Sequence, residues 1–231
     1  MADSWRTRLE ALPDHPPIDP GGTVLVISAH PDDEVLSVGA WLSEQRRRDL
    51  VFVTVTDGEA SHPGSPSITS EELRTRRPRE LAAALGELGI TDAPIHRLGL
   101  PDGDLATQRS ELRRDLAPFV EAADLVLAPF EQDGHPDHDA VGLTALELCG
   151  NHTTLWRFPI WTWSWTSPGR QHWLSSARRL GTTSAGRQRK RLAIARFTTQ
   201  VRPLSDHPAD LAVVDEALLS HALLAPEVVL T

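Results

Sequence analysis

The stretch TVLVISAHPDDEVLSVGAWL, residues 23–42, joins three kinds of sequence over a short distance. Residues 23–28 form a nearly continuous apolar, β-branched run, which is typical of a strand buried on both faces of a parallel sheet. Residues 34–48 carry apolar side chains at helical spacing. Between these two segments, a histidine, two aspartates and a glutamate occupy positions 30–34. Such a charge cluster at the end of a buried strand costs folding energy unless it is compensated, and a metal ion is a candidate for that compensation.

The rest of the chain repeats the alternation of strand and helix. Further strands are predicted at 50–56, 93–100 and 124–130, helices at 70–89, 107–123, 138–149, 186–198 and 209–224, and an extended segment at 153–165. Strands that alternate with helices predict an α/β fold, here a Rossmann-like single domain with a mostly parallel sheet and helices on both faces. Ligands in such folds bind beyond the carboxyl ends of the strands, where the strand order reverses.

The length of 231 residues suits one α/β domain over 1–231. Within it we expect a polar, proline-rich N-terminal surface segment over 1–21 and a motif-bearing core over 22–200. A C-terminal extension over 201–231 is expected to pack on that core.

Composition excludes several classes of partner. A net charge of −9 argues against a nucleic-acid partner, because phosphate binding needs an excess of Lys and Arg. No window approaches the length of a membrane span, which needs about 20 apolar residues.

Cys149 is the only cysteine, so no intrachain disulfide can form. The N-terminal sequence lacks the apolar region of a secretory signal, and we therefore expect a cytoplasmic protein.

A second polar cluster, EQDGHPDHD at 131–139, follows the strand predicted at 124–130. In the common strand order 3-2-1-4, this cluster and the one at 30–34 share one crevice. A catalytic zinc site needs three protein ligands and an open position for water. His30 and Asp33, three residues apart around a proline, can supply two of these ligands.

In that arrangement the second cluster supplies the third ligand, since His135 and His138 have the same spacing around a proline. Asp32 is then free to act as general base. Each cluster alone also has a plainer interpretation, in which its aspartates cap the following helix. Histidine and carboxylate on both walls of one crevice favour the metal site.

The two clusters, read as AHPDDEVLSVG and DGHPDHDAVG, resemble the motifs of the PIG-L (LmbE-like) family of zinc-dependent N-deacetylases. Three weaker stretches agree in order, namely RPRELAAALGELGI, LGLPDGDL and KRLAIARFTTQ. The resemblance covers roughly residues 22–200.

The resemblance implies a role for eight residues. It makes His30, Asp33 and His138 the zinc ligands and Asp32 the base. His135 would stabilise the oxyanion or protonate the leaving nitrogen, with Asp137 as its orienting partner. Asp32, acting a second time, is the alternative donor of that proton.

The remaining two, Arg77 and Asp102, match positions where relatives contact a sugar hydroxyl, and a structural ion pair is the alternative for both. The chain departs from some relatives because it contains no tyrosine; Asp133 stands where they place one.

The expected activity is removal of an N-acyl group, foremost acetyl, from an amino sugar or a sugar-containing conjugate by zinc-activated water. Fe²⁺ is an alternative cofactor, because a ligand set of two nitrogens and one oxygen accepts either metal. The expected partner is thus a small N-acylated sugar or conjugate. The alternatives are a zinc hydrolase of a non-sugar amide and a non-catalytic Rossmann-like binding protein.

Trp161, Trp163 and Trp165 recur at period two, which would place them on one face of an extended segment. That face could be a substrate wall or the subunit contact of a homo-oligomer. Packing in the core or at a sheet edge is the favoured alternative, since tryptophan is mostly buried.

Overall fold

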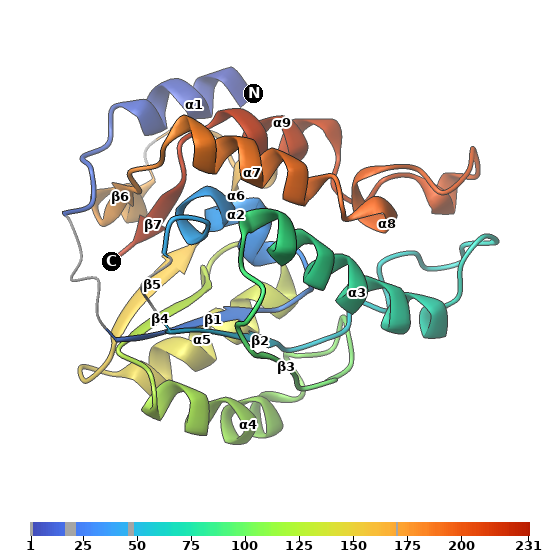
Figure 1. Cartoon of the computed structure of the whole chain (residues 1–231), viewed down its shortest axis with the longest axis horizontal. Helices are drawn as coiled ribbons and strands as arrows, with labels where there is room; N and C mark the ends of the chain where they lie inside the picture. Colours follow the sequence, from blue (N-terminus) through green and yellow to red (C-terminus); the bar gives the residue numbers. More distant parts are fainter. Residues whose placement is uncertain (1, 17–21, 46–48, 170) are drawn as a thin grey trace.

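The computed structural model describes residues 2–16, 22–45, 49–169 and 171–231, and its strands and helices alternate along most of the chain (Figure 1). The strands found there are β1 (Thr23–Ser28), β2 (Asp49–Thr54), β3 (Ile95–Arg97), β4 (Leu125–Pro129), β5 (Thr154–Phe158), β6 (Ala177–Arg179) and β7 (Val228–Leu230). They form one sheet in the order β3-β2-β1-β4-β5-β7-β6. The pairings from β3 to β5 are parallel, and β7 runs antiparallel to both of its neighbours.

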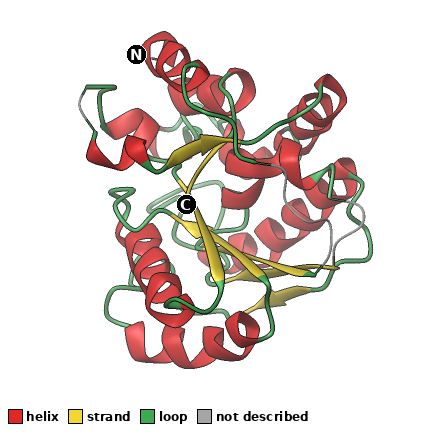
Figure 2. Ribbon diagram, turned by 90° about the vertical axis from the view of Figure 1, so that its left-hand side faces the viewer, coloured by secondary structure: helices red, strands yellow, loops and turns green. Residues whose placement is uncertain are grey.

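Helices cover both faces of this sheet, as Figure 2 shows. They are α1 (Ala2–Glu10), α2 (Asp33–Leu42), α3 (Ser70–Leu88), α4 (Arg109–Glu121), α5 (Pro136–Cys149), α6 (Thr162–Trp165), α7 (Ser184–Ile194), α8 (Thr198–Val201) and α9 (Glu216–Leu224). In Figure 1, α4 and α5 lie on one side of the sheet, and α2, α3, α7 and α9 lie on the other. The predicted Rossmann-like fold, a mostly parallel sheet between two layers of helices, is confirmed. No helix in the described part of the chain combines the length and the apolar character needed to cross a bilayer.

The packing of β1 on both faces explains why its sequence is a nearly unbroken apolar run. Val24 and Val26 belong to the core cluster on one side of the sheet, whereas Leu25 and Ile27 belong to the cluster on the other. Successive strand residues point to opposite faces, so a strand covered on both sides needs apolar residues at every position.

The bounds of α3 agree with the prediction to within one residue, whereas α2 is shorter than predicted. α3 begins with a capping box in which Thr69 accepts a hydrogen bond from the Glu72 N–H, and the helix continues through Pro78. It ends at Gly89, whose φ of 80° is a left-handed conformation that glycine adopts readily. α2 ends at Leu42 rather than at residue 48, and residues 46–48 lie outside the described part.

Both ends of the chain contribute more to the fold than predicted. Residues 2–10 form a helix whose Trp5 and Leu9 are fully buried, so the expectation of a mere surface segment is wrong for these residues. Residues 17–21 of that segment lie outside the described residues. In the C-terminal extension, residues 228–230 form β7, a strand inside the sheet. The helix predicted at 209–224 is limited to α9, after a 3₁₀ turn at Pro208–Asp210.

The tryptophan segment is not extended along its whole length. The strand β5 ends at Phe158, and the helical turn α6 follows at Thr162–Trp165. Trp163 is buried, whereas Trp165 is 53% exposed, so the expectation that the three indoles share one face is wrong.

Candidate active site

The two polar clusters meet at the carboxyl ends of β1 and β4, because these strands pair in register at the centre of the sheet. This confirms the predicted neighbourhood of the first and fourth strands. A cavity of about 270 Å³ opens there, and its lining includes His30, Asp32, Asp33 and His135. Asp33 opens α2, which follows β1, and His135 precedes α5, which follows β4.

His30, Asp33 and His138 form a buried triad of potential metal ligands. His30 Nδ1 lies 3.2 Å from His138 Nε2. His138 Nε2 lies 3.3 Å from Asp33 Oδ1, and His30 Nδ1 lies 3.8 Å from Asp33 Oδ2. Ligand atoms about 2.0–2.2 Å from a tetrahedral zinc ion are separated by about 3.3–3.6 Å. The three residues therefore fit one metal ion.

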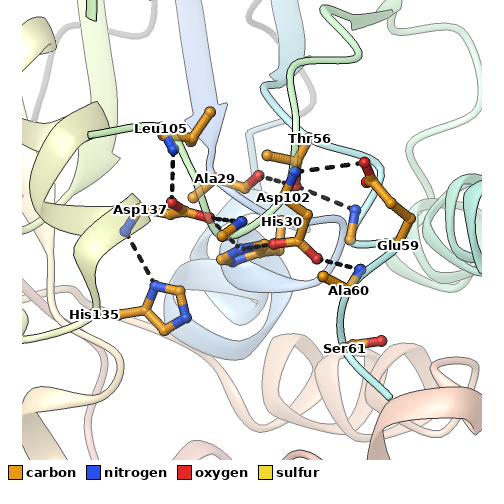
Figure 3. Close-up of polar contacts among 12 residues, drawn as sticks. Ala29, His30, Thr56, Glu59, Ala60, Ser61, Asp102, Leu105, His135 and Asp137 are labelled. Atoms are coloured by element: carbon orange, nitrogen blue, oxygen red, sulfur yellow. Dashed lines mark hydrogen bonds and ion pairs between the residues drawn. The ribbon is translucent and has the colours of Figure 1, made fainter. Parts of the chain in front are cut away.

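The ring nitrogens that face away from this triad are held by carboxylates. His138 Nδ1 lies 2.8 Å from Asp133 Oδ2. His30 Nε2 lies 3.0 Å from Asp102 Oδ1 and 3.3 Å from Asp137 Oδ2 (Figure 3). Metal-binding histidines typically donate their second ring N–H to such a group, which fixes the tautomer and the ring orientation.

The electrostatics of the triad favour positive charge. Burial opposes protonation of His30, but hydrogen bonds to Asp102 and Asp137 and the charge of Asp33 outweigh it and raise the pKa to about 9. The pKa of His138 is likewise raised, against the effect of burial, by Asp33 and Asp133. These carboxylates create a field that a divalent cation matches in charge and in ligand preference.

Asp32 lies beside the triad and is paired with Arg77, whose Nη2 is 3.1 Å from Asp32 Oδ2. Arg77 Nη1 also donates to the Gly58 carbonyl at 2.9 Å. Gly58 has a φ of 68°, and a Cβ there would fall 1.7 Å from Arg77 Nη1, so this approach requires glycine. Burial raises the pKa of Asp32 although the Arg77 charge opposes the shift. A raised pKa makes a carboxylate a better proton acceptor.

His135 lies on the same cavity, and its ring accepts the N–H of Asp137 at Nδ1, over 3.3 Å. Burial and the neighbouring histidines lower the pKa of His135 to about 4. The neutral ring thus carries its proton on Nε2, where it can donate.

Asp137 contacts His30 and His135 through different groups. Its carboxylate accepts the backbone N–H groups of Gly103 and Leu105 and contacts His30 Nε2. The hydrogen bond that orients His135 comes from the Asp137 backbone instead. His30, His135 and Asp137 form a second group whose potential ligand atoms lie within 4.8 Å of one another.

Arg77 and Asp102 both line the cavity, and both are ion-paired. Arg77 contacts Asp32, while Asp102 contacts His30 and accepts the Ala60 N–H at 2.8 Å. These contacts match the structural alternative, and contact with a sugar hydroxyl stays a prediction for both residues.

Asp133, which stands in the place of a tyrosine, has a contact with His138 that the sequence did not predict. It is 1% exposed and accepts four hydrogen bonds from residues 160–162 in addition to its contact with His138. The only signal in the sequence is a carboxylate two residues before His135.

The far wall of the cavity was also not foreseen. Gln200, Val213 and Val214 form part of it, opposite the strand ends. The long loop after β2 is bound to this wall through His62, whose ring contacts the carbonyls of Thr199 and Ala209.

Comparison with known proteins assigns the family. A model of the PIG-L family, described as GlcNAc-PI de-N-acetylase, matches residues 25–149, more than half of the chain. The chain belongs to the PIG-L family. The matched region contains both polar clusters and thus the whole metal triad.

Two curated relatives are named as deacetylases of sugar conjugates. The first, "Probable N-acetyl-alpha-D-glucosaminyl L-malate deacetylase 2" of Bacillus subtilis (strain 168), is 33% identical over 127 residues, which cover 52% of this chain and 57% of the relative. The second, 1D-myo-inositol 2-acetamido-2-deoxy-alpha-D-glucopyranoside deacetylase of Mycobacterium sp. (strain KMS), is 31% identical over 169 residues, which cover 61% and 54%. The chain thus spans little more than half the length of these relatives.

Solved structures of similar fold include two deacetylases. The zinc-inhibited form of teicoplanin deacetylase Orf2 has a TM-score of 0.67 at 21% identity, covering 90% of this chain and 97% of that one. N,N′-diacetylchitobiose deacetylase from Pyrococcus horikoshii has a TM-score of 0.58 at 23% identity, covering 75% and 68%. At these identities the likeness concerns the fold.

Proposed function

We propose that the chain is a zinc-dependent N-deacetylase that hydrolyses the acetamide of an N-acetylglucosamine unit in a small sugar conjugate. The observation that carries this proposal is that His30, Asp33 and His138 form one ligand triad, and that His30 and Asp33 face the same cavity as Asp32. The names of the two curated relatives support the acetylated amino sugar as substrate class.

The triad would hold the metal through two imidazole nitrogens and one carboxylate oxygen. Zinc bound there supplies Lewis-acid chemistry, because it polarises an amide carbonyl and lowers the pKa of water. The same donor set accepts Fe²⁺, and zinc is proposed on its preference for tetrahedral nitrogen and oxygen ligands.

Asp32 is the proposed general base. It takes a proton from the attacking water, and its pair with Arg77 holds the carboxylate in one orientation. The negative charge that develops on the amide oxygen is stabilised by the Nε2–H of His135, which its Nδ1 hydrogen bond leaves free to donate.

The proton needed by the leaving nitrogen is assigned to Asp32. A neutral imidazole is a very weak acid, so proton transfer from His135 would leave an unstable anion. Asp32 has just gained a proton from water and can return it to the nitrogen in the same cavity, which balances the reaction.

The test is release of free amine from N-acetylglucosamine and its glycosides, measured together with bound metal. We expect about one zinc ion per chain, lost in His138→Ala. Asp32→Asn should keep the metal and lower kcat by about 10²- to 10⁴-fold. Asp92→Asn, at an exposed loop aspartate, serves as the matched control and should behave as wild type. Wild-type activity in Asp32→Asn, or no amine release by the metal-loaded wild type, would overturn the proposal.

A further inference from the structure

A stacked pair of indoles, the partly buried Trp161 and the exposed Trp165, lies at the rim of the active-site cavity. Trp161 and Trp165 stack on each other with ring centroids 5.0 Å apart and planes 20° apart. Both rings are also nearly parallel to the His135 ring, each at a centroid distance of 6.3 Å. Trp165 is 53% exposed, so a ligand at the rim of the cavity can reach its indole.

Helical geometry separates this pair from the third indole of the segment. Residues four apart share one side of a helical turn, which brings Trp161 and Trp165 together. Trp163 lies between them in sequence and points into the core, where it stacks on His221. Gly134 allows the close approach of Trp165, because a Cβ at Gly134 would lie 3.1 Å from the indole. The pair is therefore placed against the loop that carries His135.

The pair is anchored to the candidate metal site. Asp133 accepts the backbone N–H groups of Ile160, Trp161 and Thr162, and the same carboxylate contacts His138. A fixed aromatic surface can select a ligand by shape, since little conformational entropy is lost on binding.

Trp161 also lines the cavity that contains His30 and His135, so the indole surface continues the cavity outwards. The cavity volume of about 270 Å³ lies at the small end of ligand pockets, which suits one sugar ring. A second ring of the same substrate must lie beyond it, over the rim.

We propose that Trp161 and Trp165 form a second subsite, which stacks on a carbohydrate ring joined to the N-acetylated sugar. This inference rests on the proposed deacetylase function. A pyranose offers a face of C–H bonds to an indole and hydroxyl groups at its edge. Polar residues next to Gly134, the exposed Gln132 and the partly exposed Asp139, match such an edge better than a wholly apolar group.

The experiment compares kcat/KM for the methyl glycoside of N-acetylglucosamine, N,N′-diacetylchitobiose and the phenyl glycoside of N-acetylglucosamine. Wild type should prefer the disaccharide, and Trp165→Ala should lower kcat/KM for the disaccharide about tenfold while leaving the methyl glycoside unchanged. Trp165→Phe, which keeps a ring, should retain part of the preference. Leu192→Ala, at an exposed leucine on α7, is the control and should change neither value.

Equal losses on all substrates, or no loss on any, would overturn the subsite while leaving the deacetylase function intact. A preference only for the phenyl glycoside would overturn the carbohydrate occupant. If wild type hydrolyses none of the three, the proposed function fails, and calorimetric binding of the uncleaved N,N′-diacetylchitobiose decides the subsite. Binding that is weakened about tenfold in Trp165→Ala supports it, and equal binding or no binding refutes it.

Discussion

Replacing Asp133 with asparagine keeps the shape of a buried side chain and removes one acceptor from the candidate site. Asp133 Oδ1 accepts the N–H groups of Ile160 and Thr162 and the Thr162 hydroxyl. Oδ2 accepts the Trp161 N–H at 2.9 Å and faces His138 Nδ1 at 2.8 Å. The amide oxygen of asparagine can replace Oδ1 with its three donors, which leaves the NH₂ group facing Trp161 and His138.

In this variant the Trp161 N–H loses its charged acceptor, and the contact with His138 becomes a neutral hydrogen bond. A hydrogen bond to a charged group contributes about 1.5–3 kcal/mol and a neutral one about 1 kcal/mol, so the free energy of unfolding should fall by about 3 kcal/mol. The NH₂ group also requires a hydrogen-bond acceptor at His138 Nδ1, which moves the ring proton to Nε2, the atom in the metal triad. Metal affinity should therefore fall about 10- to 100-fold.

Urea unfolding and zinc competition against a chelator measure the two effects separately. Asp139→Asn is the matched control, because the Asp139 carboxylate accepts the Gly134 N–H at 3.1 Å, and an amide oxygen can accept it as well. Its stability loss should stay below about 1 kcal/mol with unchanged zinc affinity. Zinc affinity in Asp133→Asn equal to that of wild type would refute the role of Asp133 as the partner of His138.

Two further predictions concern regions beside the site. Burial and the Lys190 charge lower the pKa of His221 from an ordinary 6.5 to about 3. Between pH 6.5 and pH 3, His221 is therefore protonated in the unfolded chain but neutral in the folded chain. The contribution of His221 to the free energy of unfolding should be complete above pH 6.5 and should fall by about 1.4 kcal/mol per pH unit below it. If His221→Gln shows the same pH dependence as wild type, His221 is not its cause. Asp210 accepts hydrogen bonds from the hydroxyl groups of three serines, two of which lie in the segment 65–68. Asp210→Ala should therefore accelerate amide hydrogen exchange in this segment. Asp206→Ala, at an exposed position, is the control and should leave the exchange unchanged. Equal protection in both variants would show that Asp210 does not hold this loop.

The parts of the fold that depend on local patterns were predictable. β1 and β4 are buried on both faces, so their positions follow from unbroken apolar runs. The parallel alternation then places the ends of these two strands together, and with them His30 and His138. Short-range pattern and common topology were sufficient for this part of the site.

The features that were missed depend on contacts between distant segments. The α6 turn has a strand-like sequence, but Asp133 accepts the backbone N–H groups of residues 160–162, which lead into the helical turn and stabilise its start. Likewise, β7 is only three residues long and joins the sheet because β5 and β6 offer free edges. Trp5 is surrounded by polar residues in the sequence, and its burial follows from packing against Trp163 and Trp173. No local period carries this information.

The proposed function requires that two imidazoles and one carboxylate bind a single divalent cation. X-ray absorption at the zinc edge, recorded on protein loaded with one equivalent of zinc, identifies these ligands. We expect a shell of nitrogen and oxygen at about 2.0–2.1 Å with the scattering of two imidazoles, and loss of one imidazole in His138→Ala. A sulfur ligand, a shell without two imidazoles, or the same spectrum from His138→Ala would contradict it.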